Sequence, residues 1–363
     1  NQLQLNKLNS LFKSKNFINF FGVYLSAFFI FFCLVISVFS YFIIPDKSRH
    51  SNQMHLEIAT APPSSEFLLI QIPNKKIDKS TFSEKFFGKE NPNQELVISD
   101  YELSETGIKV IKITGETELL DYGLFPNEYS PQQIEQKLIK KRNYIFGTDS
   151  FGRDLFGRLI LGTRISLSIG FISVLISLLI GLTIGMVGGY YGGFIDKIVM
   201  RVINIFWSIP TLLLVIAISV ALGKGFWQVY LAVGLTMWVE VARIVRGEVI
   251  SEKNKDYITA TKILGYSDLR IFLVHLLPNI IGPVLIICAA NFASAILIES
   301  GLSFLGIGTQ PPIPSWGSMI KDNYQFIILG KPFLAIIPGI SIMLLVTSFM
   351  FLGNNLENFL SKN

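Results

Sequence analysis

The sequence predicts an all-α polytopic membrane protein with six transmembrane helices and a small β-containing extracytoplasmic insert between helices 1 and 2. Half of the 363 residues are hydrophobic and only 16% are charged, whereas soluble globular domains contain about 25% charged residues. Apolar stretches of about 20 residues recur along the chain, and each is long enough to cross about 30 Å of hydrocarbon. A polar stretch after the first of them contains short runs of alternating apolar residues, which indicate strands.

The first apolar stretch, residues 18–44, contains no charged side chain. Lys7, Lys13 and Lys15 precede it without any acidic residue. A secretory signal peptide would have an apolar region of about 7–15 residues followed by small residues. This run is longer and ends in Phe and Ile, so we predict a retained transmembrane helix that follows a cytoplasmic segment, residues 1–17.

Five further apolar stretches predict the remaining transmembrane helices of a domain covering residues 160–358. They are residues 165–188, 199–222, 226–246, 276–300 and 332–353. Basic residues gather in the loop between the fourth and fifth of the six helices: Arg243, Arg246, Lys253, Lys255, Lys262 and Arg270. Cytoplasmic loops carry such an excess of basic residues, so this loop and both chain ends are predicted to be cytoplasmic.

Residues 45–155 form a polar segment that is predicted to lie on the extracytoplasmic side. Apolar residues alternate with polar ones at 66–72, 95–99 and 107–115, and Pro, Gly and Asn separate these runs. The alternation predicts a small β-structured insert that stays outside the membrane pore. Its two histidines, His50 and His55, are interpreted as plain surface residues rather than metal ligands.

The cytoplasmic segment 256–268, DYITATKILGYSD, is unusual because it is polar between two apolar runs. Tyr257, Ala260, Thr261 and Leu264 have the spacing of one face of a helix of about two turns. Small side chains on such a helix allow a partner to approach closely. Periodicity alone leaves open the alternative of an ordinary solvated loop.

The residues that follow predict where this short helix ends. Gly265 can take the left-handed conformation that terminates a helix, and Ser267 can cap a second helix that starts at Asp268. Leu277 and Pro278 then mark the entry into the fifth transmembrane helix.

The segment from Asp256 to Asn279 resembles the EAA loop of binding-protein-dependent ABC importer permeases. That pattern is Glu-Ala-Ala, three residues, Gly and a downstream Leu-Pro, and it matches here at Ala260, Gly265, Leu277 and Pro278. Thr259 occupies the glutamate position and Thr261 the second alanine. Any charge contact of the family's glutamate is therefore missing here or supplied by Asp256.

Other stretches are similar to the C-type permease of dipeptide and oligopeptide importers. They are residues 146–170, 188–201, 242–251, 299–320 and NNLENFL near the end. The resemblance implies the type I ABC importer permease fold, a bacterial cytoplasmic membrane location and a coupling loop at residues 250–278. It implies these ATPase-coupling residues: Asp256, Tyr257, Thr259, Ala260, Thr261, Lys262, Leu264, Gly265, Leu277 and Pro278.

The resemblance also implies the partners of the chain. These are a homologous second permease, two ATP-binding subunits and an extracytoplasmic peptide-binding protein, in addition to membrane lipid. No phosphate-binding G-x-x-x-x-G-K-[ST] motif occurs in the sequence. The chain is thus expected to bind no cofactor, with ATP and magnesium on the ATPase subunits, and to be no enzyme itself. Its net charge of +5 fits cytoplasmic membrane edges, so no nucleic-acid partner is expected.

An ion-coupled secondary transporter is the alternative function. It would call for ionisable residues within the membrane and for discontinuous repeats. Only Glu240 and Glu299 lie within or near the predicted helices, and we interpret Glu240 as lying at the cytoplasmic edge and Glu299 as lining an external gate. Two acidic residues without a repeat make this alternative the weaker one.

Two remaining features are predicted to shape the pathway. Asp149 and Arg153, in the segment GTDSFGRD, are candidates for an external gate or docking site, although a polar turn with local pairing that includes Asp154 explains them equally well. Pro210 is predicted to kink the third transmembrane helix, and its freed carbonyl would be satisfied by neighbouring helices. Such a kink can shape a pore wall.

Overall fold

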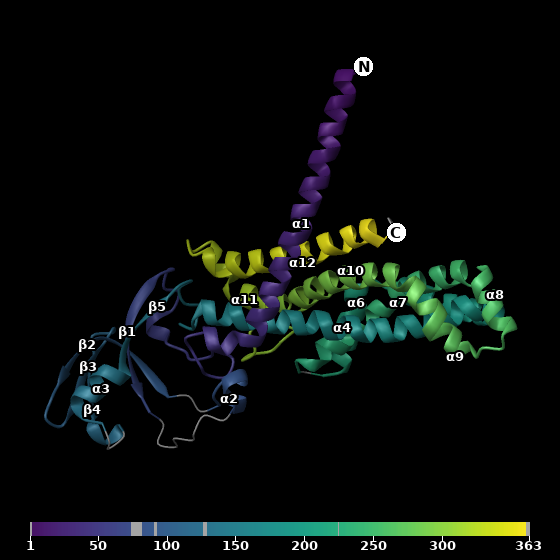
Figure 1. Cartoon of the computed structure of the whole chain (residues 1–363). Helices are drawn as coiled ribbons and strands as arrows, with labels where there is room; N and C mark the ends of the chain where they lie inside the picture. Colours follow the sequence, from purple (N-terminus) through teal and green to yellow (C-terminus); the bar gives the residue numbers. More distant parts are fainter. Residues whose placement is uncertain (1, 74–81, 91–92, 126–128, 224, 361–363) are drawn as a thin grey trace. The chain divides into compact units, whose positions relative to one another are not determined.

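The computed structural model describes residues 2–73, 82–90, 93–125, 129–223 and 225–360 (Figure 1). The chain divides into two compact units, which are described separately. The helical unit holds the residues up to Leu34, Ser166–Gln310 and the residues from Ile340 onward. The second unit, which contains the sheet, holds Val35–Ile165 and Pro311–Gly339.

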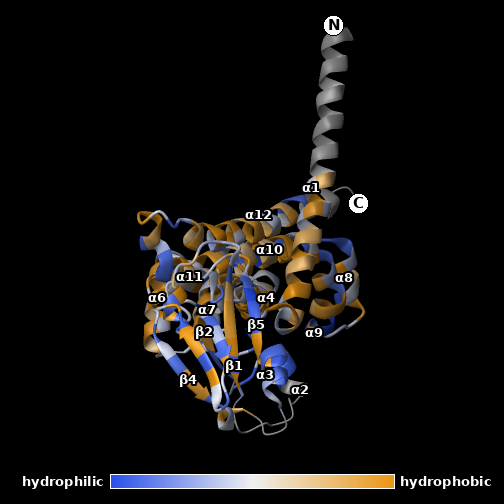
Figure 2. Ribbon diagram, turned by 90° about the vertical axis from the view of Figure 1, so that its left-hand side faces the viewer, coloured by the Kyte–Doolittle hydropathy of each residue, from blue (hydrophilic) through white to orange (hydrophobic). Residues whose placement is uncertain are grey.

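Five of the described helices are long and apolar enough to cross a membrane. The predicted spans 18–44, 165–188, 226–246, 276–300 and 332–353 all fall on them, which confirms these predictions. The helices are α1 (Gln2–Ile43), α4 (Leu155–Tyr191), α7 (Trp227–Glu252), α10 (Leu277–Phe304) and α12 (Phe333–Leu360). In Figure 2, α10 and α12 are mainly orange because their residues are apolar on most sides, as expected for helices in lipid.

The predicted third span, residues 199–222, is a broken helix. It consists of α5 (Gly193–Trp207) and α6 (Thr211–Ala221), which meet at an angle of 88°. Pro210 occupies the N-cap of α6, and the residue before a proline is driven out of the helical conformation. The predicted bend at Pro210 is therefore present, but it breaks the helix instead of kinking one continuous helix. If the pair counts as one span, the described residues contain up to six candidate spans.

Helices α4 and α7 pack closely through glycines that are four residues apart. A Cβ on Gly181 would lie 2.5 Å from the Cβ of Val241, and one on Gly185 would lie 2.8 Å from that of Val245. Both valines are fully buried. Small residues on one helix let the backbones approach each other, which is how helices associate where water supplies no driving force.

Three short helical elements lie between α7 and α10. They are α8 (Asp256–Ile263), α9 (Asp268–Arg270) and a π-helical segment (Ile271–Leu276). The last of them continues directly into α10, so the chain enters the long helix without a loop.

The second unit contains an antiparallel five-stranded sheet in the order β4-β3-β2-β1-β5. The predicted strands 66–72, 95–99 and 107–115 correspond to β1 (Ser65–Ile72), β2 (Gln94–Leu103) and β3 (Gly107–Lys112). The sequence analysis missed β4 (Thr117–Asp121), β5 (Ile139–Tyr144) and α3 (Pro131–Leu138). Figure 2 shows α3 and β5 largely in blue, because polar residues dominate both elements.

Both faces of the sheet are covered. Ile70 of β1 and Ile98 of β2 face α3, where they pack around Ile134. The neighbouring Leu69 and Val97 face the opposite side of the sheet and belong to a second buried cluster. Alternate residues of a strand point to opposite faces, so this two-sided burial accounts for the apolar runs that predicted the strands.

The remaining elements of the second unit are short. They are the 3₁₀ turns Leu56–Ile58, Tyr122–Leu124 and Tyr324–Ile327, with α2 (Phe82–Phe87) and α11 (Trp316–Asn323). Trp316 is 2% exposed, and its indole N–H donates to the Leu159 carbonyl in α4 over 3.0 Å. This bond ties α11 to the first turns of α4.

Candidate functional site: the coupling segment and the broken helix

Helix α8 ends in a glycine-containing turn, as the sequence predicts. Gly265 has a φ of 75°, in the left-handed region that favours glycine. Its N–H donates to the Lys262 carbonyl over 3.0 Å, and the Tyr266 N–H donates to the Thr261 carbonyl over 3.1 Å. These two bonds form a Schellman motif, which satisfies carbonyls that the helix end would leave free.

The faces of α8 differ from the predicted ones. The predicted face combined Tyr257, Ala260, Thr261 and Leu264, but Thr261 is only 7% exposed while Ala260 and Leu264 are exposed. Ile258 is fully buried and holds the inner side of the helix against the core of the helical unit. The small residue that α8 presents outward is therefore Ala260, flanked by the exposed Thr259, while Thr261 faces inward.

Three large apolar side chains in residues 256–270 are exposed, and we call them the apolar ridge. Its side chains are Ile263, which is 81% exposed, Leu264 at 68% and Leu269 at 67%. The sequence analysis named only Leu264 of the three. These residues could have been found from the sequence, because they are large apolar residues in a mostly polar segment. Exposed apolar patches of this kind mark interaction sites.

The start of α8 is anchored to the end of α7. The Tyr257 hydroxyl donates to Glu252 Oε2 over 2.7 Å, and Lys255 Nζ lies 2.6 Å from Glu252 Oε1. The Glu252 side chain is 11% exposed. Burial and the hydrogen bond to Glu252 raise the pKa of Tyr257 to about 12, so the hydroxyl remains a donor at neutral pH. Asp256, in the first turn, is exposed.

The residues after Gly265 are anchored to the end of α4. Both Tyr190 and Tyr191 donate hydroxyl hydrogen bonds to the Asp268 carboxylate, over 2.9 and 2.8 Å. Lys262 Nζ lies 4.7 Å from the centroid of the Tyr190 ring, a cation–π contact. Ser267 occupies the predicted N-cap position, but its side chain makes no capping hydrogen bond. Asp268, through the two tyrosines, provides the anchor at this end instead.

Leu277 and Pro278 lie at the first turn of α10, as predicted for the entry into the fifth transmembrane helix. Pro278 has no N–H to donate, and it lies where the π-helical segment Ile271–Leu276 gives way to α10. Within the segment 256–278, α8 is thus a short helix whose flanking residues are bonded to the ends of α7 and α4.

Asp149 and Arg153 form a buried ion pair. Arg153 Nε donates to Asp149 Oδ2 over 2.7 Å, and the two side chains are 3% and 2% exposed. Arg158 Nε lies 3.6 Å from the same Asp149 oxygen, and an Arg153 nitrogen lies 3.7 Å from Asp322. The local pairing that the sequence allowed is present in the structure, and the assignment of Asp149 and Arg153 to an external gate or docking site stays a prediction. Asp154 instead accepts from the Phe156 N–H over 3.1 Å at the start of α4.

His55 is not the surface residue that the sequence analysis expected. It is 6% exposed, and its Nε2 lies 3.6 Å from Glu95 Oε2. Arg142 donates two hydrogen bonds to the Glu95 carboxylate, over 2.7 and 2.6 Å. Burial by itself would raise the pKa of Glu95, but the nearby His55, the two hydrogen bonds from Arg142 and the Arg142 charge outweigh it and lower the pKa to about 2.

Glu299 lies inside the last turns of α10 and is fully buried. The Ser303 hydroxyl donates to Glu299 Oε1 over 2.7 Å and accepts from the Thr309 N–H over 3.1 Å. This bonding joins the end of α10 to the loop that follows. The assignment of Glu299 to an external gate stays a prediction, and in this structure its side chain is buried within the helical unit.

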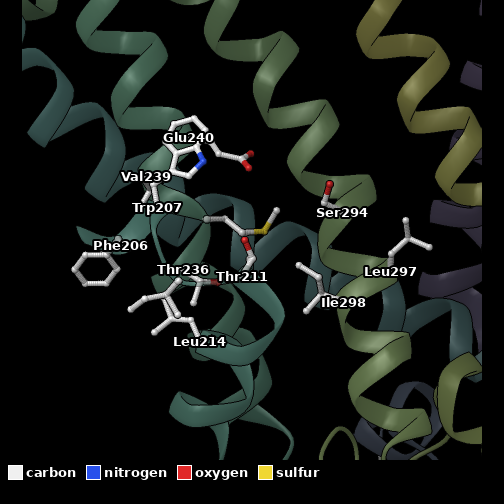
Figure 3. Close-up of a pocket in the computed structure, with 12 residues that line it drawn as sticks. Phe206, Trp207, Thr211, Leu214, Thr236, Val239, Glu240, Ser294, Leu297 and Ile298 are labelled. Carbon is white, nitrogen blue, oxygen red and sulfur yellow. The ribbon is translucent and has the colours of Figure 1, made fainter. Parts of the chain in front are cut away.

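The break at Pro210 borders a pocket of about 340 Å³ (Figure 3). Pro210 itself is not among the lining residues, but its neighbours Ile209 and Thr211 are. The other walls come from α7, which contributes Glu240, and from α10, which contributes Ser294. Glu240, which was expected at the cytoplasmic edge of the membrane, lies near the middle of α7, since that helix continues to Glu252.

Residues 181–362 match the family described as "Binding-protein-dependent transport system inner membrane component". This chain belongs to that family. It is therefore a multi-pass membrane protein and a transport permease subunit, and the fold expected from the resemblance is confirmed.

Several curated proteins are similar to this permease. The dipeptide transport system permease protein DppC of Bacillus subtilis (strain 168) is 42% identical over 224 residues, which cover 62% of this chain and 70% of the relative. The oligopeptide transport system permease protein OppC of Salmonella typhimurium is 40% identical over 215 residues, 59% of this chain and 71% of the relative.

Among solved structures, a chain of the inward-facing MetNI methionine ABC transporter is 19% identical, with a TM-score of 0.47. The match covers 56% of this permease and 96% of that chain. An amino acid ABC transporter crystallised with histidines matches with a TM-score of 0.43 and 18% identity, over 56% of this permease and 94% of that chain.

Proposed function

We propose that this chain is a permease subunit of an ATP-binding-cassette importer and forms half of the translocation pathway for dipeptides or oligopeptides. The family membership and the relatives named as dipeptide and oligopeptide permeases support this proposal. The alternative, an ion-coupled secondary transporter, has no support among these relatives.

The observation that carries the coupling role is the build of segment 256–278. Its ends are anchored to α7 through Glu252 and to α4 through Asp268, so a push on α8 is transmitted to two long helices. Its outward side presents Ala260 and the apolar ridge of Ile263, Leu264 and Leu269. A helix that exposes apolar side chains can bind in an apolar groove of a partner protein.

The proposed assembly contains a homologous second permease, two cytoplasmic ATP-binding subunits and an extracytoplasmic peptide-binding protein. ATP and magnesium bind to the ATPase subunits, and this chain contributes no catalytic group. Of the residues assigned to coupling, Asp256, Thr259, Ala260, Lys262 and Leu264 are exposed to a partner. Thr261, Gly265, Leu277 and Pro278 shape the segment, and Tyr257 anchors it.

Two substitutions test the coupling role. Gly265→Pro cannot adopt the φ of 75° and removes the N–H bonded to Lys262, while Ala260→Trp fills the exposed outward surface. We expect both variants to reach the membrane at normal levels and to lose ATP-driven peptide uptake. Gln136→Trp, on the exposed side of α3, is the matched control for added bulk. Normal uptake by both coupling variants refutes the assignment.

The proposed topology places both chain ends in the cytoplasm of a bacterial cell and the insert, residues 45–155, outside. Lys89 is exposed, so a cysteine there is accessible to reagents without distorting a core. In a variant without Cys33 and Cys288, Lys89→Cys is expected to react in intact cells with a thiol reagent that cannot cross the membrane. Reaction only after the cytoplasmic membrane is opened shows that the insert is inside and that segment 256–278 faces away from the ATPases.

A further inference from the structure

The pocket beside the helix break is walled by four helices of the helical unit. Its apolar wall includes Phe206 and Trp207 at the end of α5, and Leu297 and Ile298 on α10. Its polar groups are few: the hydroxyls of Thr211, Thr236 and Ser294, and the carboxylate of Glu240. Figure 3 shows this carboxylate pointing from α7 toward the side of α10 that carries Ser294 and Leu297. Apolar walls with a few converging polar groups are the usual build of a small-molecule site.

Glu240 is the charged group of this pocket, and it lies near the middle of a helix that can span the membrane. Residues on either side extend α7 to Trp227 and to Glu252, so about 18–20 Å of helix separates Glu240 from each end. Within the part of the chain that the structure describes, no hydrogen bond or ion pair reaches its carboxylate. A charge at this depth is costly, and charges retained there usually serve a pathway.

The nearest candidate counter-ion on the same helix contacts the Trp207 wall of the pocket instead of the Glu240 carboxylate. Arg243 lies three residues after Glu240, one turn away, but its guanidinium is stacked 4.2 Å from the centroid of the Trp207 ring. It forms no ion pair with Glu240 in the structure as described. The carboxylate therefore faces the pocket without compensation, and a cation is the chemical class that would compensate it.

We propose that this pocket is a binding subsite for a positively charged group, and that the group is an ammonium of the peptide in transit. Glu240 accepts the ammonium hydrogen bonds, the Ser294 hydroxyl is within the same cavity as a further acceptor, and Phe206 provides an aromatic wall that tolerates a cation. The identity of the cation as a peptide group rests on the function proposed above, whereas the site itself rests on the pocket geometry.

Binding is tested without transport, on the purified complex of the permeases and ATPases and in the absence of the binding protein. Cys33 and Cys288 are replaced by alanine, and Leu297→Cys places a thiol in the apolar wall of the pocket, where no proposed acceptor is lost. Alanyl-alanine amide, a cation, is compared with N-acetyl-alanyl-alanine amide, its neutral analogue, for protection of this thiol from a small alkylating reagent. We expect the cation to protect at concentrations at least tenfold lower than the neutral amide, because a charge-assisted hydrogen bond contributes about 1.5–3 kcal/mol.

Glu240→Gln removes the charge and keeps the size of the side chain. It is expected to abolish the difference between the two amides, while Glu240→Asp keeps a preference for the cation. Glu248→Gln removes a carboxylate from the same helix outside the pocket lining and is expected to change nothing. Equal protection by both amides, or an unchanged preference in Glu240→Gln, overturns the proposal. The comparison of the amides on unmodified Glu240 decides the question even if the variants do not assemble.

Transport provides the second measurement. At saturating binding protein, Glu240→Gln is expected to lower the uptake rate of a peptide with a free amino group about tenfold or more, while ATP binding by the partner subunits is unchanged. No uptake of any peptide by the unmodified complex, together with charge-selective protection, shows that the subsite exists but that the peptide assignment is wrong. Peptide uptake that is indifferent to Glu240→Gln leaves the importer function intact and overturns the subsite.

Discussion

The apolar ridge of α8 and α9 supports a quantitative prediction about assembly with the ATPase subunits. Burying an isoleucine or leucine side chain completely contributes about 1.5–3 kcal/mol. Ile263 is 81% exposed in the isolated chain, so its burial in a groove of the partner can supply about 1.2–2.4 kcal/mol. Ile263→Ser is therefore expected to weaken ATPase binding by roughly tenfold to fiftyfold, since 1.4 kcal/mol corresponds to a factor of ten.

The measurement is a titration of the purified permease pair with the ATPase subunit in detergent, with ATP-driven uptake in proteoliposomes as the second readout. Leu119→Ser is the matched control, because Leu119 is 55% exposed on strand β4, outside the coupling segment. We expect the control to bind and transport normally. Leu264→Ser and Leu269→Ser are expected to weaken binding by similar factors, because these side chains are 68% and 67% exposed.

The opposite pattern refutes this reasoning. If Ile263→Ser binds the ATPase with unchanged affinity but enters the membrane poorly, the ridge contacts lipid rather than a protein groove. If the control weakens binding as much as the ridge variants do, the effect is a general loss of stability and carries no information about the interface.

Three further predictions concern stability. Gly185→Leu is expected to lower the free energy of unfolding of the purified protein by about 1–3 kcal/mol, because the larger side chain overpacks the contact with α7. Gly247→Leu is expected to have a smaller effect, because a Cβ at Gly247 would have no neighbouring atom within 4 Å. Equal losses in the two variants contradict the close packing of α4 and α7. Glu95 has a pKa lowered to about 2 from an ordinary 4.5, so it stabilises the insert above pH 4.5 by up to about 3 kcal/mol, and this stability is lost as the pH falls toward 2. Amide hydrogen exchange in β1 and β2, measured during thermal unfolding at several pH values, reports this stability. A pH profile that is unchanged in Glu95→Gln contradicts the prediction. Gly265→Ala is expected to lower the local stability of residues 256–268 by about 1–2 kcal/mol, because alanine is strained at positive φ. Amide hydrogen exchange in this segment is then faster, and Gly265→Asn is expected to have a smaller effect. Identical exchange rates in the two variants argue against a conformational cause.

The long helices and three of the strands could be predicted because they depend on patterns that are local in the sequence. An uncharged run of about 20 residues has few solutions other than a transmembrane helix, and the prediction holds for α1, α4, α7, α10 and α12. Strands β1, β2 and β3 were found from alternation. Strand β5 was missed because its sequence, IKKRNY, has polar residues at four of its six positions. It is a strand because its backbone pairs with β1.

In the coupling segment, too, some features could be predicted from the sequence and others could not. The Schellman turn at Gly265 was predictable, because glycine is the residue that adopts its φ at little cost. Which side of α8 faces outward was not, because the helix is short and both Ile258 and Ile263 are apolar. The core around Ile258 decided the orientation, and Ile263 was left exposed.

The membrane class, the family, five apolar helices and the position of the proposed coupling segment could all be predicted from the sequence. Each of these follows from hydrophobic length or from a motif carried by neighbouring residues. Only the tertiary structure decided that Pro210 lies at an 88° break, that Asp149 and Arg153 are paired in the interior, and that Glu240 faces a pocket. Burial and pairing depend on residues that are distant along the chain, and no local pattern reports which of them meet.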